Sequence, residues 1–423
     1  MNDREQRGLA LAALYRIEQV DGKWHVPSQA GDGKIYVVDP QKRHCNCPDH
    51  DTRGVKCKHM FAVEFVQTRE RNMDGTETVT RTFKVTERVT YKQDWPNYNK
   101  AQTQEKRMFQ YILADLCRNI AEPEVKGPGR KPVKLADLTF ACVFKVYSTL
   151  SARRFTCDLQ DAATAGHISK AAHFNVVIKH MDDAALTSVL KSLIVESSRP
   201  LAAIETSFAV DSSGFSTSRF CRWFDHKYGK TMEEREWVKV HLVCGTKTNV
   251  VTAVEILGQN AGDSPQLPAL LRTTAKHFAV KEMSADSAYT SLDNMEEVAA
   301  VGGVPYFAFK EKTTGAVGGM FAKMFHFYCF NKDEYLAHYH KRSNVESTFS
   351  MIKGKFRDHV RSKSDAGMTN EVLCKVLCHN ICCLIHSMFE LGIEARFWGD
   401  ATQPDEGLVA IASEDDSTSW AWM

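Results

Sequence analysis

The chain has 423 residues, 43% of them hydrophobic and 25% charged, with a formal net charge of +2. This length predicts more than one domain and enough apolar side chains for a sizeable core. The near-balanced charge excludes binding to nucleic acid through net charge alone, so such a role depends on local basic patches, as at 126–134 and 341–361. No apolar run approaches the ~20 residues of a membrane-spanning helix, which predicts no membrane partner.

The 13 cysteines point to a reducing compartment. Their number is odd, their spacing is irregular, and the polar N-terminus lacks the apolar core of a signal peptide. We therefore expect a cytoplasmic protein whose clustered cysteines bind metal or fill cores.

Residues 1–75 predict a small domain, in which 34–39 has the composition of a strand. Residues 76–133 follow as a Thr- and Val-rich linker or exposed hairpin, a helix at 100–120 and a basic connector.

The connector at 127–132 reads GPGRKP. Two prolines and two glycines in six residues favour an extended chain. The segment resembles an arm that enters the minor groove, in which Arg130 and Lys131 would contact DNA. A plain linker is the alternative.

Residues 134–200 form a helical region, with helices expected at 134–149, 156–165, 169–181 and 183–197. Gly166 provides a tight turn between the second and third helices, and Ser169 is the expected N-cap of the third. We interpret the region as DNA-binding, through a helix-turn-helix. Ordinary helical packing is the alternative.

Beyond residue 200, strands alternate with helices, which predicts an α/β domain over 201–395. The strands are expected at 207–211, 237–243, 250–257, 282–286 and 304–310. The helices are expected at 267–277, 292–300, 339–357 and 370–390. Residues 396–423 are acidic and predict a solvated tail.

Cys45, Cys47, Cys57 and His59 form the first group with specific chemistry. Thiolates and an imidazole suit tetrahedral Zn²⁺, and four protein ligands make a closed, structural site. The pattern Cys-x-Cys-xn-Cys-x-His, followed by a helix at 60–67, resembles a SWIM zinc finger. We therefore expect one structural Zn²⁺ in the first domain.

His44 and His50 are alternative ligands, and four unligated, reduced side chains are the other alternative. The finger is surrounded by cations, namely Lys42, Arg43, Arg53, Lys56 and Lys58. Their charge favours contact with DNA phosphate, and a purely structural finger is the alternative.

The helix expected at 339–357 has a polar stripe within an arc of about 60°. The stripe consists of Tyr339, Arg342, Glu346 and Lys353, and Arg357 continues it. An apolar stripe lies beside it and consists of Val345, Phe349, Ile352 and Phe356. The helix therefore buries one side and presents a lone carboxylate among cations, which suits binding of a metal ion together with a phosphate.

Asp211 and Asp286 follow predicted strands, and open α/β sheets place their chemistry at such strand ends. Mg²⁺ prefers oxygen ligands and shares its coordination shell with substrate phosphate. Together with Glu346, the two aspartates would hold two ions about 4 Å apart. For each aspartate alone, a cap or turn residue is the alternative.

The spacing Tyr-x2-Arg-x3-Glu-x6-Lys in the polar stripe resembles the signature of bacterial DDE transposases of the insertion-sequence-four group. The segments AVDSSGF around Asp211, ADSAYTS around Asp286 and GDSPQLPALL at 262–271 are similar to that family's segments. The resemblance covers about 130–390. It implies a ribonuclease H-like mixed sheet in the catalytic domain. In this chain the helical DNA-binding region and the zinc finger domain precede that domain, and such a finger is not a standard part of the family.

The resemblance also implies the chemistry. Water cleaves a phosphodiester, and the freed 3′-hydroxyl joins the strand to target DNA. The carboxylates of Asp211, Asp286 and Glu346 would bind two Mg²⁺ or Mn²⁺ ions. The residues expected to contact DNA in this domain are Tyr339, Arg342, Lys353 and Arg357.

The implied partner is double-stranded DNA, both the terminal inverted repeats of an insertion sequence and the target. Joining two ends implies a homodimer on DNA, at the nucleoid of a bacterium or archaeon. Only 60 residues separate Asp286 from Glu346, which leaves no room for the long β-rich insertion of members that form DNA hairpins. A non-catalytic DNA-binding regulator derived from a transposase and a metal-dependent DNA nuclease are the alternative functions.

A second cysteine group has a metal-like spacing, since Cys374, Cys378 and Cys382 recur every four residues near His379 and His386. These residues alternate with apolar side chains along the helix expected at 370–390. We therefore predict that these cysteines are buried core residues rather than ligands.

Overall fold

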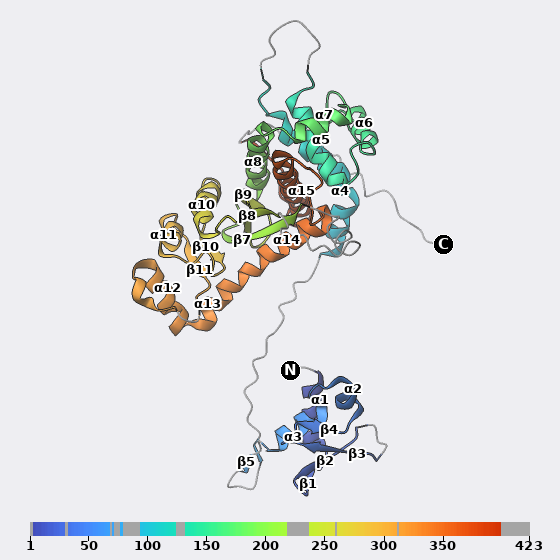
Figure 1. Cartoon of the computed structure of the whole chain (residues 1–423), viewed down its shortest axis with the longest axis vertical. Coiled ribbons are helices and arrows are strands. Elements are labelled where there is room, and N and C mark those ends of the chain that lie inside the picture. Colours follow the sequence, from blue (N-terminus) through green and yellow to red (C-terminus); the bar gives the residue numbers. More distant parts are fainter. Residues whose placement is uncertain are drawn as a thin grey trace, which may run out of the picture. The chain divides into compact units, whose positions relative to one another are not determined.

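The computed structural model describes residues 3–29, 33–67, 70–71, 77–78, 94–123, 132–217, 237–258, 260–310 and 313–398. The chain divides into two compact units, Met1–Lys92 and Gln93–Met423 (Figure 1). Arg130 and Lys131 of the predicted connector, most of the predicted hairpin and the acidic tail from 399 on lie outside the described residues.

The N-terminal unit contains an antiparallel sheet in the order β1-β2-β3-β4. Its strands are β1 (Glu18–Val20), β2 (Lys23–Pro27), β3 (Ile35–Asp39) and β4 (His44–Cys45), and its helices are α1 (Asp3–Leu14), α2 (Pro48–Arg53) and α3 (Lys58–Gln67). Helices α1 and α3 pack closely at Gly8. A Cβ added there would lie only 2.6 Å from the Cβ of Phe61, so the contact requires glycine. Two short strands, β5 (Glu70–Arg71) and β6 (Glu77–Thr78), pair farther along the chain.

The second unit is a mixed α/β structure whose sheet has the order β11-β10-β7-β8-β9. The strands are β7 (Ser207–Ser216), β8 (Trp237–Gly245), β9 (Val251–Gly258), β10 (Glu282–Ala285) and β11 (Val304–Phe307). Strand β8 pairs antiparallel with β7 and β9, whereas β10 pairs parallel with β7 and β11. The central strand β7 therefore joins the antiparallel half of the sheet to its parallel half.

Strand β7 is longer than the sequence predicts. The strand expected to end at Asp211 continues to Ser216, because every residue from Phe208 to Ser216 pairs with β8. The expectation that Asp211 ends its strand is therefore wrong, and its carboxylate leaves the middle of a central strand instead.

Helices cover both faces of this sheet (Figure 1). The helices that precede it are α4 (Trp95–Arg118), α5 (Leu135–Ser148), α6 (Thr156–Thr164), α7 (Phe174–Met181) and α8 (Ala185–Ser198). Those that follow β9 are α10 (Leu267–Ala275), α11 (Leu292–Ala300), α12 (Gly319–Phe330), α13 (Lys332–Tyr339), α14 (Ser343–Phe356) and α15 (Asp365–Leu391).

Side chains of β7 alternate between two hydrophobic cores. Phe208 and Val210 belong to the core that α10 and α11 cover. Ala209 and Phe215 belong to a larger core, shared with α4, α5, α8, α14 and α15. Asp211 has the same parity as Ala209 and Phe215, so its side chain lies on the face that α14 covers.

In the helical region, α7 begins at Phe174, several residues later than expected. His173 precedes the helix and accepts a hydrogen bond from the N–H of Asn175 at 3.3 Å. The hydroxyl of Ser169 donates to the carboxylate of Asp137 instead, so the N-cap prediction for Ser169 is wrong. Helix α7 packs against α5 and α15, and the helix-turn-helix stays a prediction.

Helix α15 is the central helix of this unit and contacts α4, α5, α8 and α14. Cys374 and Cys378 are fully buried and Cys382 is 7% exposed, which confirms that they are core residues. By length and composition α15 could cross a membrane, contrary to our expectation, but 83% of its most apolar stretch is buried inside the structure.

One side chain of α15 ties three elements together. Asn380 is fully buried, and its amide nitrogen donates to the carbonyl oxygens of Ile194 at 3.2 Å and Val251 at 2.7 Å. Its amide oxygen accepts a hydrogen bond from the N–H of Val251 at 2.8 Å. Helices α15 and α8 and the start of β9 therefore depend on this one amide.

We expect the substitution Asn380→Ala to lower the free energy of unfolding of the second unit by about 3 kcal/mol, because it leaves buried backbone groups without partners. The measurement is the denaturant midpoint of the full chain. Asn331→Ala is the matched control, because Asn331 is exposed and its side chain makes no capping bond. Equal losses in both variants would contradict the structural role of Asn380.

Candidate active site and metal centre

Parallel pairing brings the two predicted aspartates together. Val210 of β7 lies opposite Ala285 of β10, so Asp211 and Asp286 are the next residues along two neighbouring strands. The carboxylate of Asp286 also accepts a hydrogen bond from the N–H of Ala288 at 2.7 Å. This bond holds the turn after β10 and fixes the carboxylate beside the sheet.

Glu346 lies on α14, the helix that covers the face of the sheet on which the side chain of Asp211 lies. The predicted helix at 339–357 is divided into α13, a 3₁₀ turn η4 (His340–Arg342) and α14. Val345, Phe349, Ile352 and Phe356 are buried as predicted. Glu346 is in the first turn of α14, and its side chain is 58% exposed, so one carboxylate is presented beside the buried aspartate.

Arg342 connects the first and third carboxylates. Its Nη1 donates to Oδ2 of Asp211 at 2.8 Å, and its Nη2 donates to Oε1 of Glu346. Burial opposes the charge of the guanidinium, but Asp211, Tyr339 and Glu346 outweigh that effect and raise the pKa of Arg342. The cation therefore neutralises two acidic groups that would otherwise repel each other.

The pKa of Asp211 is raised from its ordinary value, chiefly because the carboxyl is buried. The hydrogen bond from the N–H of Ser212 and the charge of Arg342 act in the opposite direction, whereas Asp286 and Glu346 raise the pKa further. Three acidic side chains thus influence one another electrostatically at the centre of the sheet. A cation near them is favoured because it offsets both their repulsion and the cost of burial.

Lys353 lies two turns beyond Glu346 and also faces β7. Its Nζ donates to the hydroxyl of Ser213 at 2.6 Å and lies 5.3 Å from the ring centre of Phe215. Burial lowers the pKa of the ammonium. A cation held in a partly buried position, against Ser213 and two residues along β7 from Asp211, suits contact with an anionic substrate.

Arg357 does not continue the polar stripe of α14. It lies just beyond the helix with a φ of 74°, and its guanidinium donates to the carbonyl oxygen of Thr149 at 3.2 Å. The prediction of a continuous stripe is wrong here, because the chain leaves the helix at this residue and turns toward α5.

Sequence reasoning missed a polar cluster beside Asp211. Oδ1 of Asp263 accepts hydrogen bonds from the hydroxyl of Ser212 at 3.0 Å and from Nζ of Lys239 at 2.7 Å. The buried ring of His241 lies 3.3 Å from the hydroxyl of Tyr289 and 3.5 Å from Asp263. Asp263 is in the GDSPQLPALL segment. The resemblance of this segment to the transposase family is the sequence feature that could have identified the cluster. The cluster fixes the residue that follows Asp211 in the chain.

In the N-terminal unit, Cys45, Cys47, Cys57 and His59 converge. Their ligand atoms all lie within 4.8 Å of one another and all four residues are buried, the one such group among the described residues. Nδ1 of His59 lies 3.9 Å from the sulfurs of Cys45 and Cys57, and its Nε2 is buried without a partner. Three sulfurs and one imidazole nitrogen in this arrangement fit a tetrahedral zinc ion.

One of the three thiols, that of Cys57, is favoured as the thiolate that binds a metal. A hydrogen bond from Cys45 is the largest effect that lowers the pKa of Cys57, to about 3, and the same interaction raises the pKa of Cys45. His44 and His50 are outside the convergent group, and Nδ1 of His50 is 2.8 Å from the carbonyl oxygen of Val55.

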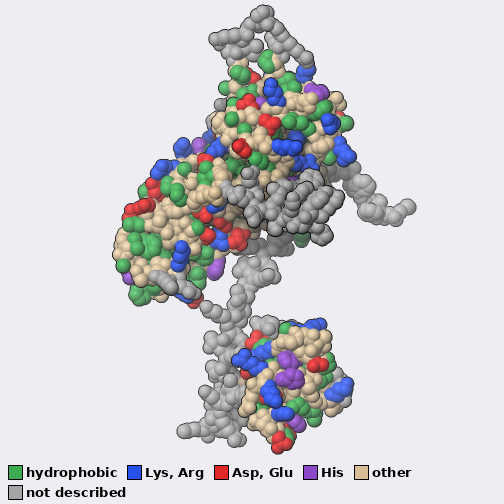
Figure 2. All heavy atoms as spheres, in the orientation of Figure 1, with side chains coloured by type: hydrophobic (Ala, Val, Ile, Leu, Met, Phe, Trp, Pro, Cys, Tyr) green, Lys and Arg blue, Asp and Glu red, His purple; other side chains and the backbone are tan. Residues whose placement is uncertain are grey.

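Cations gather beside this cluster. A cavity of about 710 Å³ next to Cys47 and His59 is lined by Arg4, Arg7, Arg53 and Lys58. On the face of this unit seen in Figure 2, His side chains in purple and Lys or Arg side chains in blue lie together at the surface. Asp49 pairs with Arg4 at 2.8 Å and with Arg53 at 3.5 Å, so this carboxylate offsets part of the charge of these two arginines.

Residues 204–381 match the family model of the Transposase DDE domain. No solved structure gives a match. The matched range begins just before β7 and ends within α15, so it contains the three carboxylates together with Arg342 and Lys353. The match supports a DDE transposase, an enzyme family that cuts and joins DNA and usually uses divalent metal ions.

Proposed function

We propose that the protein is a DDE transposase of the insertion-sequence-four-like group, which binds the terminal inverted repeats of its element, cleaves DNA and transfers the strand. The observation that carries the proposal has two parts: the pairing of β7 with β10, which makes Asp211 and Asp286 neighbours, and the guanidinium of Arg342, which pairs with both Asp211 and Glu346. The match to a transposase domain over these residues supports it independently.

The proposal includes a ribonuclease H-like catalytic domain. Its support is the sheet topology, in which the antiparallel strands β7, β8 and β9 are followed by β10 and β11 in parallel on the other side of β7. In this arrangement the first and fourth strands of the sheet are neighbours. Carboxylates on these two strands therefore lie close together although 75 residues separate them in the chain.

Two divalent ions, Mg²⁺ or Mn²⁺, would be held by the oxygens of Asp211, Asp286 and Glu346. The donor set fits these hard cations, which prefer carboxylate oxygens and share their coordination with phosphate. When bound, such ions stabilise the charge on the attacking and leaving oxygens of the phosphodiester. A cation at this place also favours the ionised form of Asp211, whose pKa burial raises.

The residues of the chain itself orient the DNA. Arg342 and Lys353 carry positive charge on either side of Glu346 along the helix axis, and Tyr339 lies one turn before Arg342. These three side chains would hold the phosphates next to the cleaved bond, so that the attacking group lies in line with the leaving oxygen. The cleavage requires no covalent attachment to the protein.

The N-terminal unit is proposed to be a SWIM-type zinc finger that contacts DNA phosphate. The convergence of three cysteines and one histidine supports zinc, and the cationic cavity beside them supports contact with an anion. We further propose that the protein works as a homodimer on DNA, because two element ends must be joined, and that it acts in the cytoplasm, at the nucleoid of a bacterium or archaeon.

We expect each of the substitutions Asp211→Asn, Asp286→Asn and Glu346→Gln to lower metal-dependent strand transfer about 100-fold or more, because a metal ligand is lost. Binding to the element ends should remain. Asp293→Asn is the matched control, because Asp293 is an exposed aspartate of the same domain. Joined products are measured with the element's own ends, and a variant that keeps full activity removes its residue from the site.

The same assay separates the alternative functions. Purified protein that binds the ends but never nicks them with Mg²⁺ or Mn²⁺ would be a DNA-binding regulator. Protein that nicks without producing joined strands would be a nuclease.

We expect metal analysis to find one zinc ion per chain and to find none when Cys45 and Cys57 are both replaced by Ser, because both sulfurs belong to the ligand set. Cys157→Ser is the control, since Cys157 is an exposed free cysteine. A double variant that retains its zinc would show that the finger assignment is wrong.

A further inference from the structure

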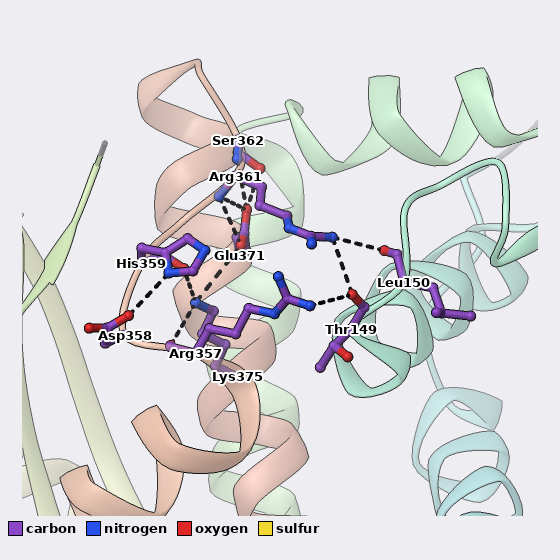
Figure 3. A network of polar contacts seen from close by, with 9 residues as sticks. All are labelled: Thr149, Leu150, Arg357, Asp358, His359, Arg361, Ser362, Glu371 and Lys375. Atoms are coloured by element: carbon purple, nitrogen blue, oxygen red, sulfur yellow. Dashed lines mark hydrogen bonds and ion pairs between the residues drawn. The ribbon is translucent and has the colours of Figure 1, made fainter. Parts of the chain in front are cut away.

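A small basic pocket lies beyond the end of α14, away from the three carboxylates. It is a hollow of about 20 Å³. Its charged lining residues are Lys145, Arg357, Arg361, Lys375 and Glu371. The lining therefore has four cations and one carboxylate, which come from α5, α15 and the segment between α14 and α15. Figure 3 shows Arg357, Arg361, Glu371 and Lys375 of this set.

The backbone of this segment is held by a buried lysine. Nζ of Lys375 donates to the carbonyl oxygens of Arg357 at 3.1 Å and His359 at 2.6 Å, and the residue is only 1% exposed. The segment also joins the sheet, since the N–H of Val360 donates to the carbonyl oxygen of Ser216 at 2.9 Å. The pocket is therefore built on the end of β7 and on α15, which are both parts of the core.

The two arginines point in the same direction, toward the end of α5 (Figure 3). Arg357 and Arg361 each donate to the carbonyl oxygen of Thr149 at 3.2 Å, and Arg361 also donates to that of Leu150 at 3.2 Å. The carbonyl acceptor of Arg357 is neutral, so it orients that guanidinium group without cancelling its charge.

The one carboxylate of the pocket, that of Glu371, accepts hydrogen bonds mainly from backbone and hydroxyl groups rather than from the cationic side chains. Glu371 accepts hydrogen bonds from the backbone N–H groups of Arg361 at 2.9 Å and Ser362 at 2.8 Å, and from the hydroxyl of Ser362 at 2.9 Å. Its distance to Nζ of Lys375 is 3.9 Å. The lining therefore keeps an excess of positive charge.

The electrostatics of Lys375 agree with this excess. Burial is the main cause that lowers its pKa, to about 8, and the charges of Arg357 and Arg361 lower it further, against Glu371 and Asp358. Among the described residues, the ammonium of Lys145 makes no hydrogen bond or ion pair. Cations that repel one another in a partly buried place are stabilised by an anion that binds between them.

The size of the hollow restricts the anion. A water molecule needs about 10–15 Å³ of cavity, so a hollow of about 20 Å³ admits one group of that size. A non-bridging oxygen of a phosphate fits this limit, whereas a base or a whole nucleotide does not. The remainder of the phosphate then lies outside, where the exposed Arg361 is.

We propose that Lys145, Arg357, Arg361 and Lys375 bind one backbone phosphate of the DNA substrate at a site separate from the catalytic carboxylates. This inference rests on the proposed function, and it adds a second anchoring point for the same DNA. Arg357 follows Glu346 by 11 residues, which is about 17 Å along a helix. Along β7, Asp211 and Ser216 are also about 17 Å apart, so the anchored phosphate lies about five base pairs from the cleaved bond.

The test is DNA binding as a function of salt, without divalent metal, by the full chain and the double variant Lys145→Gln/Arg357→Gln. The slope of log K against log salt concentration should fall by about one, with weaker binding to every sequence. Arg272→Gln is the control, because Arg272 is an exposed cation on α10, across the sheet. Arg357→Lys keeps the charge and should retain most of the wild-type slope.

A second measurement locates the phosphate. Methylphosphonates are placed one at a time along an element end, and wild-type protein should lose affinity at one position about five base pairs from the cleaved bond. The double variant should be insensitive at that position. An unchanged slope, or the same profile in both proteins, overturns the proposal.

A third measurement tests whether the pocket binds inorganic phosphate in the absence of DNA. If it raises the melting temperature of the wild type but not of the double variant, while the DNA slope is unchanged, the pocket binds a free anion and the DNA proposal is wrong. Failure of the proposed function gives a different result. The salt dependence of DNA binding then still differs between the wild type and the double variant, but the wild type shows no strand transfer.

Discussion

The candidate site depends on the parallel pairing of β10 with β7. Because Val210 lies opposite Ala285, the residues that follow them, Asp211 and Asp286, lie side by side. A shift of this register by one residue would turn one of the two carboxylates to the opposite face of the sheet. The register is in turn held by the core between the sheet and α10, in which Phe208, Val210 and Met283 are fully buried.

The other face of the sheet supplies the third carboxylate and the cations. Helix α14 buries Val345 and Ile352 against this face, which fixes the rotation of the helix and directs Glu346 and Lys353 toward β7. Helix α15 packs behind α14 and is tied to the start of β9 by Asn380. The polar site is therefore held between two apolar cores, and this packing explains why Asp211 is half-buried although it is charged.

Local patterns predicted much of this arrangement. The helix expected at 292–300 coincides with α11, and the stripes along 339–357 identify the buried and polar sides of α14. Local patterns could not predict contacts between segments that are distant in the sequence. The small, polar residues after Asp211 resemble a turn, and only their pairing with β8 makes them a strand. Ser169 has the composition of an N-cap, but Asp137, 32 residues earlier, accepts its hydroxyl.

The position of Arg342 links the state of the site without metal to the proposed reaction. Its guanidinium occupies oxygens of Asp211 and Glu346, and these are oxygens that divalent ions would need. The positive guanidinium of Arg342 and a divalent ion at the same carboxylate oxygens repel each other. Metal binding therefore competes with the two ion pairs of Arg342. Once displaced, the side chain remains within one helical turn of the carboxylates, beside the phosphate it would contact. In the proposed reaction, one arginine would stabilise two repelling acids before DNA arrives and neutralise substrate charge afterwards, which would explain why a cation is placed four residues before Glu346.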